Sequence, residues 1–426
     1  MRCATRDGAY VSTGARSAFL APFQVRSFRY QWLADLLTSW AIEMEVLILG
    51  WFILVETGSV LLLTLFGSLQ YFGTLISPLF GMAGDRFGHR NVLCVMRASY
   101  AALAAFIAVL AFMGVLEPLH ALMITAVAGM VRPSDLAMRS ALVSQIVPPD
   151  RLMGAMGVSR TTSDSARVIG ALAGAAIFAA LGMAVAYVAI TAFYLAGLAL
   201  NLFFVPAGIR FGHTGAVKPS FLREVVEGMR YVRRTPVLLA AMALAFLVNL
   251  TAFPTTLGLL PYVAREVYHI GQTGLGTLIA AFSLGALMGS LTVGFVANRL
   301  QPARVMMVTA VVWYLMVLLF VYMPDPTTGR IVLAAAGFCQ SLSMVPLAAM
   351  LMRVSEERYR GRVMGVRMLA IYGLPIGLMA YGGIMEWIGF VATATTYCIV
   401  GLVLTVAIAV WWRTELWPAD AAGNRR

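Results

Sequence analysis

Residues 81–93 read GMAGDRFGHRNVL and form a short polar interval between two long apolar runs. Gly88 allows a tight turn here, because glycine adopts backbone conformations that other residues avoid. Asp85 lies close to Arg86 and Arg90, so its carboxylate can pair with a guanidinium group or cap a helix N-terminus. A run of about 20 apolar residues can cross a bilayer as a helix. The interval is therefore predicted to be a loop that joins two membrane spans.

The same alternation of apolar runs and short polar intervals continues in both directions. The 426 residues are 61% hydrophobic and 12% charged, whereas soluble domains are about 45–50% apolar and about 25% charged. One soluble core cannot bury this excess, which argues against a soluble enzyme, a nucleic-acid binder and a disordered scaffold. We expect an all-α membrane protein with twelve transmembrane helices, at 30–55, 60–82, 92–113, 119–145, 161–181, 184–205, 237–262, 273–296, 305–323, 331–352, 363–384 and 389–412.

The longest polar interruption, at 207–236, divides these runs into six and six, which predicts two six-helix bundles. Apolar residues recur at helical spacing in 220–234 with Arg and Glu between them, a pattern typical of a helix that lies on a membrane surface. The expected organisation is a cytoplasmic tail at 1–28, a first bundle at 29–206, a linker with an amphipathic helix at 207–236, a second bundle at 237–413 and a cytoplasmic tail at 414–426.

Basic residues give the expected orientation. With the N-terminus in the cytoplasm, 27 of the 31 basic residues fall in cytoplasmic tails and loops, Arg97 and Arg167 among them. The other four are Arg132 and Arg139, inside a span, and Arg265 and Arg330, in outer loops. Such an excess follows the positive-inside rule. It predicts a multi-pass protein of the bacterial inner membrane with both termini in the cytoplasm, and it accounts for the net charge of +12 without nucleic acid.

The two halves of the sequence repeat weakly. The segment at 81–86 reappears in altered form at 294–299, in each case at the cytoplasmic end of the second span of its half. The Ala-Gly pair at 128–129 recurs 208 residues later at 336–337. Chance similarity within an apolar chain is the alternative, but the matching positions favour a duplicated six-helix unit. Two such units predict a central cavity between two bundles.

The stretch at 81–93 resembles the signature loop of the major facilitator superfamily, G-x-L-A-D-R-x-G-R-R-x-x-L, between spans 2 and 3. The residues that match and that we single out for gating are Gly81, Asp85, Arg86, Gly88 and Arg90. The stretches at 49–51, 57–59, 167–170 and 227–234 resemble the enterobactin-exporter and macrolide-efflux branch of the superfamily. The resemblance implies the major facilitator fold, alternating access, and a role for the loop aspartate in holding the bundles together on the cytoplasmic side. The stretch at 170–175 lacks the Pro and the last Gly of the family's antiporter motif, G-P-x-x-G-G.

Small residues spaced by four recur in the spans and let helix backbones approach closely in lipid. In the resembled fold, spans 2, 5, 8 and 11 form the surface between the bundles, so the resemblance implies a packing role there. Abundant glycine, 39 in the chain, is the alternative explanation. The residues concerned are Gly73, Ser77, Gly170, Gly174, Gly285, Gly289, Gly373 and Gly377.

Ionisable residues inside spans cost about 2.5–3.5 kcal/mol each at the helix centre and are therefore functional candidates. The fourth-span residues lie on one helix face, at positions 132, 135 and 139. In the resembled fold, spans 1, 4, 7 and 10 line the cavity, so acidic span 1 is expected to face basic span 4 across it. The candidates for proton coupling and the substrate cavity are Asp35, Glu43, Glu45, Arg132, Asp135, Arg139, Asn249 and Gln340.

Among these, Glu43 is our preferred proton carrier, because it shares a broad helix face with Asp35. Burial favours the neutral acid whereas a nearby arginine favours the carboxylate, so a carboxyl group between the two influences can bind and release a proton. The alternative is a structural ion-pair network that fixes spans 1 and 4.

These features predict a secondary active transporter that couples proton entry to the efflux of small amphipathic molecules, such as a drug or a siderophore. No phosphate-binding GxxxxGK[ST] motif is present, which argues against ATP as the energy source. Uptake or lysophospholipid transport by the same fold, and a non-transporting membrane receptor, remain alternatives. Scattered Cys and His residues predict no metal site, disulfide framework, cofactor or enzyme activity. The expected partners are a small molecule, protons and the lipid bilayer, and the chain is expected to be a monomer that binds no nucleic acid.

Overall fold

The structure is a computed structural model that describes residues 21–206, 221–296 and 301–416. Within these ranges the chain is almost entirely helical, and they contain no strand. The predicted tails and the first part of the linker therefore lie largely outside the described residues. So does the end of the second copy of the repeated segment, with Asn298 and Arg299.

The first half of the chain folds into one group of helices. They are η1 (Ala21–Gln24), α2 (Arg26–Thr57), α3 (Val60–Leu69), η2 (Phe72–Ile76), α4 (Ser77–Phe87), α5 (His89–Phe112), α6 (Pro118–Ile146) and α7 (Pro149–Phe204). The 56-residue α7 is interrupted at Gly182, which has a φ of 78°. A side chain would be strained in this conformation, so glycine permits the chain to turn back here. The two parts of α7 are thus two separate membrane crossings.

The second half forms the other group. Its elements are α8 (Phe221–Arg234), α9 (Pro236–Thr251), η3 (Pro254–Gly258), α10 (Leu260–Tyr262), η4 (Val263–Val267), α11 (Gln272–Val296), α12 (Pro302–Val321), α13 (Pro326–Val354), η5 (Glu357–Tyr359), α14 (Arg360–Ala370), α15 (Gly373–Ile388), α16 (Phe390–Trp411) and α17 (Arg413–Leu416). The crossing that starts with α9 continues through π-helical turns at η3 and η4. Prolines within this stretch explain them, because proline cannot donate a helical hydrogen bond.

The number of crossings agrees with the twelve expected. Among the described residues, nine helices are long and apolar enough to cross a membrane, or eleven when two bent helix pairs are each counted as one. The pairs are α3 with α4, bent by 49°, and α8 with α9, bent by 113°. Counting α7 as two crossings, because of the break at Gly182, gives twelve.

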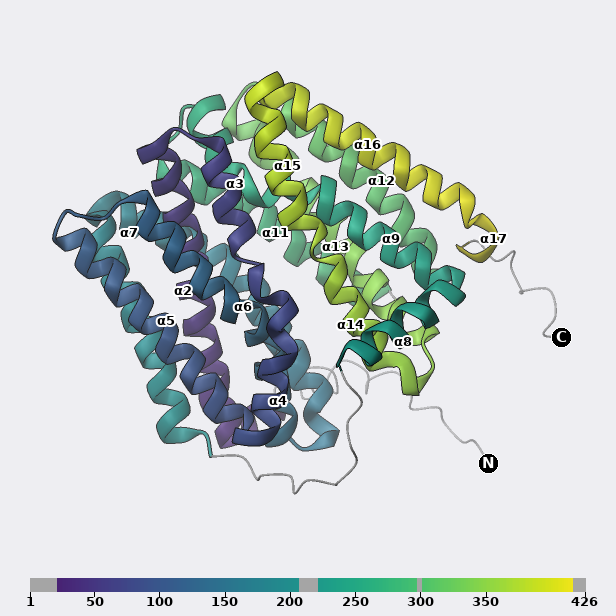
Figure 1. Cartoon of the computed structure of the whole chain (residues 1–426), viewed down its shortest axis with the longest axis horizontal. Helices are drawn as coiled ribbons and strands as arrows, with labels where there is room; N and C mark the ends of the chain where they lie inside the picture. Colours follow the sequence, from purple (N-terminus) through teal and green to yellow (C-terminus); the bar gives the residue numbers. More distant parts are fainter. Residues whose placement is uncertain (1–20, 207–220, 297–300, 417–426) are drawn as a thin grey trace, which may run out of the picture.

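The helices gather into two bundles that lie side by side, α2 to α7 and α9 to α16 (Figure 1). The turns at one end carry the signature loop and most described arginines, and we call this the arginine-rich end. The turns at the opposite end, which we call the arginine-poor end, include Gly58, Gly114, Gly182 and Gly389. The bundles are joined where α3 runs beside α15 and where α7 packs on α11.

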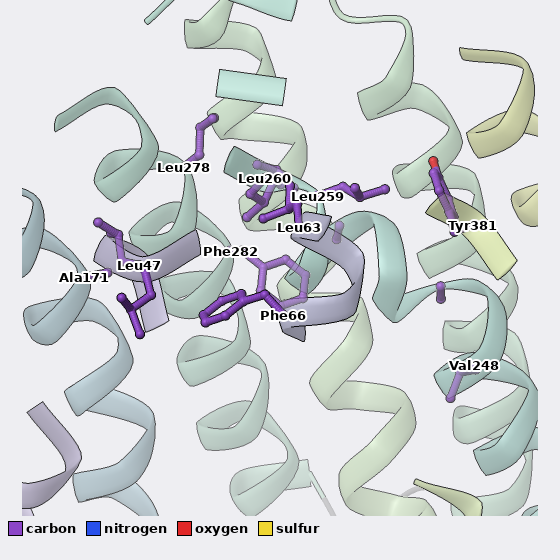
Figure 2. Packing of buried hydrophobic residues seen from close by; sticks show 14 of the residues in the cluster. Leu47, Leu63, Phe66, Ala171, Val248, Leu259, Leu260, Leu278, Phe282 and Tyr381 are labelled. Atoms are coloured by element: carbon purple, nitrogen blue, oxygen red, sulfur yellow. The ribbon is translucent and has the colours of Figure 1, made fainter. Parts of the chain in front are cut away.

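One hydrophobic core extends across the boundary between the bundles. Figure 2 shows Leu63 and Phe66 of α3 in a cluster with Leu260 and Phe282 of the second bundle. All four side chains are buried, with at most 4% of their surface exposed. The boundary is therefore packed as tightly as a protein interior where these helices meet.

The amphipathic helix α8 is docked on the second bundle. The ring of Tyr231 in α8 stacks on that of Tyr359, with centroids 4.3 Å apart. Glu227 Oε2 lies 3.1 Å from Arg362 Nη1. The surface helix is thus attached to α14 and η5 by both an aromatic contact and an ion pair.

The predicted stripes of small residues do mark close helix contacts, but the structure differs over which helices meet there. A Cβ atom on Gly73 would lie 2.1 Å from the backbone oxygen of Met130 in α6. In the same way, Gly170 and Gly174 pack on α2, Gly285 and Gly289 on α13, and Gly373 and Gly377 on α9. Ser77 begins α4 and is half-buried. The seven glycines therefore join helices within a bundle, not between bundles as we expected.

Other glycines make the close approach between the bundles. A Cβ atom on Gly382 would lie 2.2 Å from Thr64 Oγ1, and one on Gly276 would lie 2.6 Å from the Cβ of Ala175. Gly67 similarly faces Leu378. The sequence analysis missed these positions, because spacing indicates that a helix has a small-residue face but not which neighbour that face meets.

The internal repeat is visible in the packing. A Cβ atom on Gly129 of α6 would lie 2.0 Å from the backbone oxygen of Leu69. A Cβ atom on Gly337 of α13 would lie at the same distance from the backbone oxygen of Phe282. These two glycines are the ones that the repeat aligns. The same helix joint therefore occurs in both bundles.

Candidate functional site

A cluster of four buried charged residues surrounds the first carboxylate of α2. Asp35 forms an ion pair with Arg97 of α5, and its Oδ1 lies 3.5 Å from Arg139 Nε in α6. Arg139 also pairs with Asp135, one turn earlier on the same helix. We call Asp35, Arg97, Asp135 and Arg139 the Asp35 cluster. Two positive and two negative charges compensate one another there, which burial requires.

Arg97 corrects the sequence analysis, which assigned it to a cytoplasmic loop. It lies inside α5, its side chain is 0% exposed, and its Nη1 donates to the backbone oxygen of Gly197 at 3.2 Å. A buried guanidinium group needs a partner, and Asp35 supplies it. The signal was present in the sequence, because position 97 falls within the apolar run at 92–113.

A second cluster lies further along α2. Arg132 Nη2 donates to Glu45 Oε2 at 2.7 Å, and the hydroxyl of Tyr194 donates to the same oxygen at 2.9 Å. Arg132 Nη1 also lies 3.4 Å from Gln70 Oε1. We call Glu45, Arg132 and Tyr194 the Glu45 cluster. The acidic residues of α2 and the basic residues of α6 are therefore in direct contact in these clusters, where we expected them to face each other across a cavity.

Glu43 is the most accessible of the three candidate carboxylates of α2. Its side chain is 27% exposed, against 10% for Asp35 and 7% for Glu45. Its Oε1 lies 3.5 Å from Nε of Arg167 in α7, whose side chain is 51% exposed. Arg167, like Arg97, was assigned to the cytoplasmic side. The Glu43–Arg167 pair is therefore the most exposed part of the charged site.

The position of this pair relative to the bundle boundary is informative. Gly170, one turn after Arg167, packs directly on Glu43 and Trp40. Ala171, the next residue, and Ala175, one turn further along α7, contact Gly276 of α11 in the second bundle. The Glu43–Arg167 pair therefore lies next to the point where the two bundles come together.

The second bundle provides uncharged polar groups instead. Asn249 donates to the backbone oxygen of Ala245 on its own helix at 2.8 Å, and Gln340 is half-buried on α13. The hydroxyls of Thr251 and Tyr314 lie 2.6 Å apart. Among the described residues of these crossings, no buried charged pair matches those of the first bundle, so the chemical asymmetry between the halves persists in the structure.

The stretch at 81–93, which we predicted to be a loop, is helical on both sides of Gly88, because α4 ends at Phe87 and α5 begins at His89. Gly88, with a φ of 90°, forms the turn between the two helices, and we keep the name signature loop for this stretch. Arg90 holds the end of α7, because its Nε donates to the backbone oxygen of Asn201 at 3.0 Å and its Nη2 to that of Leu202. A cation at the C-terminal end of a helix is favourable, since carbonyl groups there lack helical partners. These contacts fasten the loop within the first bundle.

The other loop residues lie nearer the surface. Asp85 Oδ1 is 3.9 Å from Nε2 of His89, and Arg86 lies over the ring of Phe87 at 5.3 Å. A Cβ atom on Gly81 would meet nothing within 4 Å. The gating role that the resemblance implies for these residues remains a prediction.

Hydrogen bonds cross the bundle boundary from the arginine-poor end to the middle of the molecule. Arg265 donates to the backbone oxygen of Leu54, near the end of α2. Deeper in, the hydroxyl of Ser68 donates to the backbone oxygen of Pro375 at 3.1 Å, and that of Tyr372 to the oxygen of Phe72 at 3.3 Å. Together with the glycine contacts, these bonds seal this half of the boundary.

Comparisons with known proteins agree with this architecture. Residues 17–425 match the model of a family described as transmembrane secretion effector. Enterobactin exporter EntS of Salmonella choleraesuis (strain SC-B67) is 32% identical over 146 residues, which cover 33% of this chain and 35% of the exporter. EntS of Escherichia coli O1:K1 / APEC is 24% identical over 48% of this chain and 49% of the exporter. The matches thus span about a third to a half of the length of these curated relatives.

The fold is similar to that of solved transporters. The nucleoside transporter NupG superposes with a TM-score of 0.71 at 14% identity, covering 92% of this chain and 100% of NupG. At such low sequence identity the likeness concerns the fold alone. It matches the arrangement of two bundles described above.

Proposed function

The chain belongs to the transmembrane secretion effector family, a family of major-facilitator transporters rather than enzymes, and we propose that it exports small amphipathic molecules in exchange for protons. The observation that carries this proposal is the Glu43–Arg167 pair, a partly exposed carboxylate within the membrane next to the bundle boundary. Intramembrane carboxylates are costly, and those that remain accessible typically serve proton or substrate pathways.

The pair suggests how a proton and a cargo molecule compete. When Glu43 is ionised, it pairs with Arg167 and the local charge is balanced. Protonation of Glu43 removes that partner, so the guanidinium group becomes available to an anionic or polar group of the cargo. The Asp35 and Glu45 clusters are more deeply buried and more completely paired, so they hold α2 against α5 and α6 during this exchange.

Alternating access requires that one end be sealed while the other is open. The contacts between the bundles concentrate toward the arginine-poor end, where Arg265 and Gly382 contribute. The positive-inside rule supports a cytoplasmic location for the opposite end. We infer that the described state receives cargo from the cytoplasm. We further propose that the protein is a monomer in the bacterial inner membrane, with both termini in the cytoplasm and no nucleic-acid partner. The proposed domain limits are those given in the sequence analysis.

The cargo class follows from the wall opposite the charges. The polar side chains of α9, and those of α13 between its two arginines Arg330 and Arg353, are amides and hydroxyls, including Asn249 and Gln340, within otherwise apolar helices. Such a wall suits a molecule with both apolar and polar parts, which includes siderophores and many drugs. The similarity to enterobactin exporters supports the siderophore class.

The decisive experiment uses proteoliposomes with an imposed pH gradient and a panel of fluorescent amphipathic compounds and a catecholate siderophore. Wild type is expected to move cargo and protons in opposite directions. Glu43→Gln is expected to lose gradient-driven transport by at least about tenfold but to retain cargo exchange without a gradient, because the neutral side chain still fits. Glu56→Gln, an exposed glutamate near the end of the same helix, is the matched control.

Three results would contradict the proposal. Movement of cargo and protons in the same direction would indicate uptake, for example of a solute or a lysophospholipid. Ligand binding without any flux would indicate a receptor. Normal gradient-driven transport by Glu43→Gln would show that another group couples the proton.

A further inference from the structure

A cavity of about 470 Å³ lies in the second bundle, away from the charged clusters of the first. It is formed by α11 and α12, which both pack on α13. The described residues that line it are Thr292, Val293, Pro302, Arg304, Val305, Val308, Thr309, Leu342, Pro346, Ala349 and Arg353. None of the candidate transport residues is among them.

The lining separates into an apolar part and a cationic part. Val305, Val308 and Leu342 provide aliphatic surface, and 56% of the surface of Val308 is exposed. Arg304 and Arg353 both lie toward the arginine-rich end. The described lining contains no carboxylate that would neutralise these two arginines.

Arg304 carries a second indication of an absent partner. Its Nε atom is buried and has no hydrogen-bond partner among the described residues. A buried, charged donor without an acceptor is unfavourable. The Nε atoms of Arg97, Arg132 and Arg139 also lack a hydrogen-bond acceptor within the described ranges, but each of those arginines pairs with a carboxylate. The residue also lies in the first turn of α12, where unpaired backbone N–H groups and the helix dipole favour an anion.

The corresponding region of the first bundle is filled. There Gly84 of α4 lies against His89 and Met138, 2.9 Å and 3.2 Å from a built Cβ. His89 Nδ1 is also 2.9 Å from the side-chain amide of Gln145. The internal repeat leads one to expect the same close packing between α11, α12 and α13, yet the second bundle has a cavity with two arginines at this place.

We propose that this cavity binds one anionic phospholipid of the surrounding bilayer. The phosphate lies between Arg304 and Arg353, and one acyl chain runs along Val305, Val308 and Leu342. Guanidinium groups bind phosphate through paired, charge-assisted hydrogen bonds. An apolar groove that opens beside an exposed valine suits an acyl chain, whereas a free phosphate ion would leave that surface unfilled. The bound lipid would replace the helix packing that the first bundle has at this place.

The test is native mass spectrometry of the full chain released from nanodiscs that contain either dioleoylphosphatidylglycerol or dioleoylphosphatidylcholine. Wild type is expected to retain one phosphatidylglycerol and no phosphatidylcholine. Arg304→Gln/Arg353→Gln is expected to bind phosphatidylglycerol at least about tenfold more weakly, because two charge-assisted contacts are lost. Arg233→Gln/Arg358→Gln removes two exposed arginines at the same end and is the charge-matched control, expected to bind as wild type does.

A second variant keeps the proposal testable if the arginine variant does not fold. Ala349→Phe leaves both arginines in place but occupies the cavity, so it is also expected to lose the lipid. Equal binding by wild type and Ala349→Phe, or equal loss in the charge-matched control, would overturn the proposal. Displacement of the lipid by excess inorganic phosphate would also overturn it, since a free anion would then suffice. The lipid readout does not depend on the transported cargo.

Discussion

At the scale of single residues, Asp35 is notable because two arginines from different helices share it. Arg97 and Arg139 approach the same carboxylate oxygen. Removing one member of a buried ion pair leaves an uncompensated charge, whereas removing both often costs little. The Asp35 cluster should therefore behave as a unit.

Arg97→Leu is expected to destabilise the protein by about 3–5 kcal/mol, because Asp135 and Asp35 would then share one arginine. The double variant Arg97→Leu/Asp35→Leu should recover a large part of that loss. Thermal unfolding of the detergent-solubilised variants, with ligand-free wild type as reference, measures both. Additive losses in the double variant would indicate that the two side chains do not interact.

A residue outside the membrane spans gives a prediction about pH. Asp325 caps α13, and hydrogen bonds from the hydroxyl and N–H of Thr328 and the N–H of Thr327 lower the pKa of its carboxyl group below the usual 3.8. A lowered pKa in the folded state gives stability that is present above pH 3.8 and is lost as the pH falls through the lowered value. Asp325→Asn keeps a capping side chain but cannot titrate. The melting temperature should fall less steeply below pH 4 in this variant than in wild type, and parallel curves would argue against the effect.

The sequence predicted some of these charged residues correctly and misplaced others. It identified Asp35, Glu43 and Glu45, because a carboxylate in an apolar run is conspicuous. It misplaced Arg97 and Arg167, because an arginine near the end of a run looks like a cytoplasmic anchor until its partner is known. Which acid pairs with which base depends on helix rotation, and a single sequence does not determine that rotation.

At the scale of helices, glycine residues let neighbouring helix backbones come into direct contact. The spacing of small residues in the sequence correctly predicted close helix contacts, but we expected those contacts to lie between the bundles. A helix in the middle of a bundle has neighbours on several sides, so spacing alone leaves the partner open. The structure assigns Gly73 and its counterparts to contacts inside each bundle.

Gly73→Ala tests whether these glycine contacts stabilise the helix packing. The new methyl group would overlap the backbone oxygen of Met130, which lies 2.1 Å from the built Cβ, so we expect a loss of about 1–3 kcal/mol from overpacking. Gly81→Ala is a control in the same crossing, because nothing lies within 4 Å of its Cβ. Comparable melting temperatures for Gly73→Ala and wild type would contradict the contact.

At the scale of the whole molecule, the boundary between the bundles must open and close if the proposed mechanism holds. Thr64 and Gly382 face each other across it, and the built Cβ of Gly382 lies 3.2 Å from that of Thr64. This separation is just below that of a disulfide, about 3.5–4.5 Å between Cβ atoms. The pair is therefore suited to a reversible lock.

Thr64→Cys/Gly382→Cys, made in a chain without Cys3, Cys94, Cys339 and Cys398, is expected to stop transport when oxidised and to regain it on reduction. Either single variant under the same oxidant serves as the control. The measurement is cargo flux in proteoliposomes together with the fraction of cross-linked protein. Undiminished flux in fully cross-linked protein would mean that this part of the boundary does not move.

The large-scale architecture was the most predictable part. Run length predicted twelve crossings, because each crossing of a bilayer needs about 20 apolar residues. The polar interruption at 207–236 predicted two halves. The sealed half of the boundary was not predictable, since it depends on contacts such as Arg265 with Leu54 that join residues far apart in the chain.

The twin joints at Gly129 and Gly337 have a consequence for how such a chain can be altered. Both halves contain the same close helix contact, but among the described residues the ion pairs buried inside membrane crossings belong to the first half. A hybrid protein that joins this first half to the second half of a relative should therefore still be driven by protons but should prefer the relative's cargo.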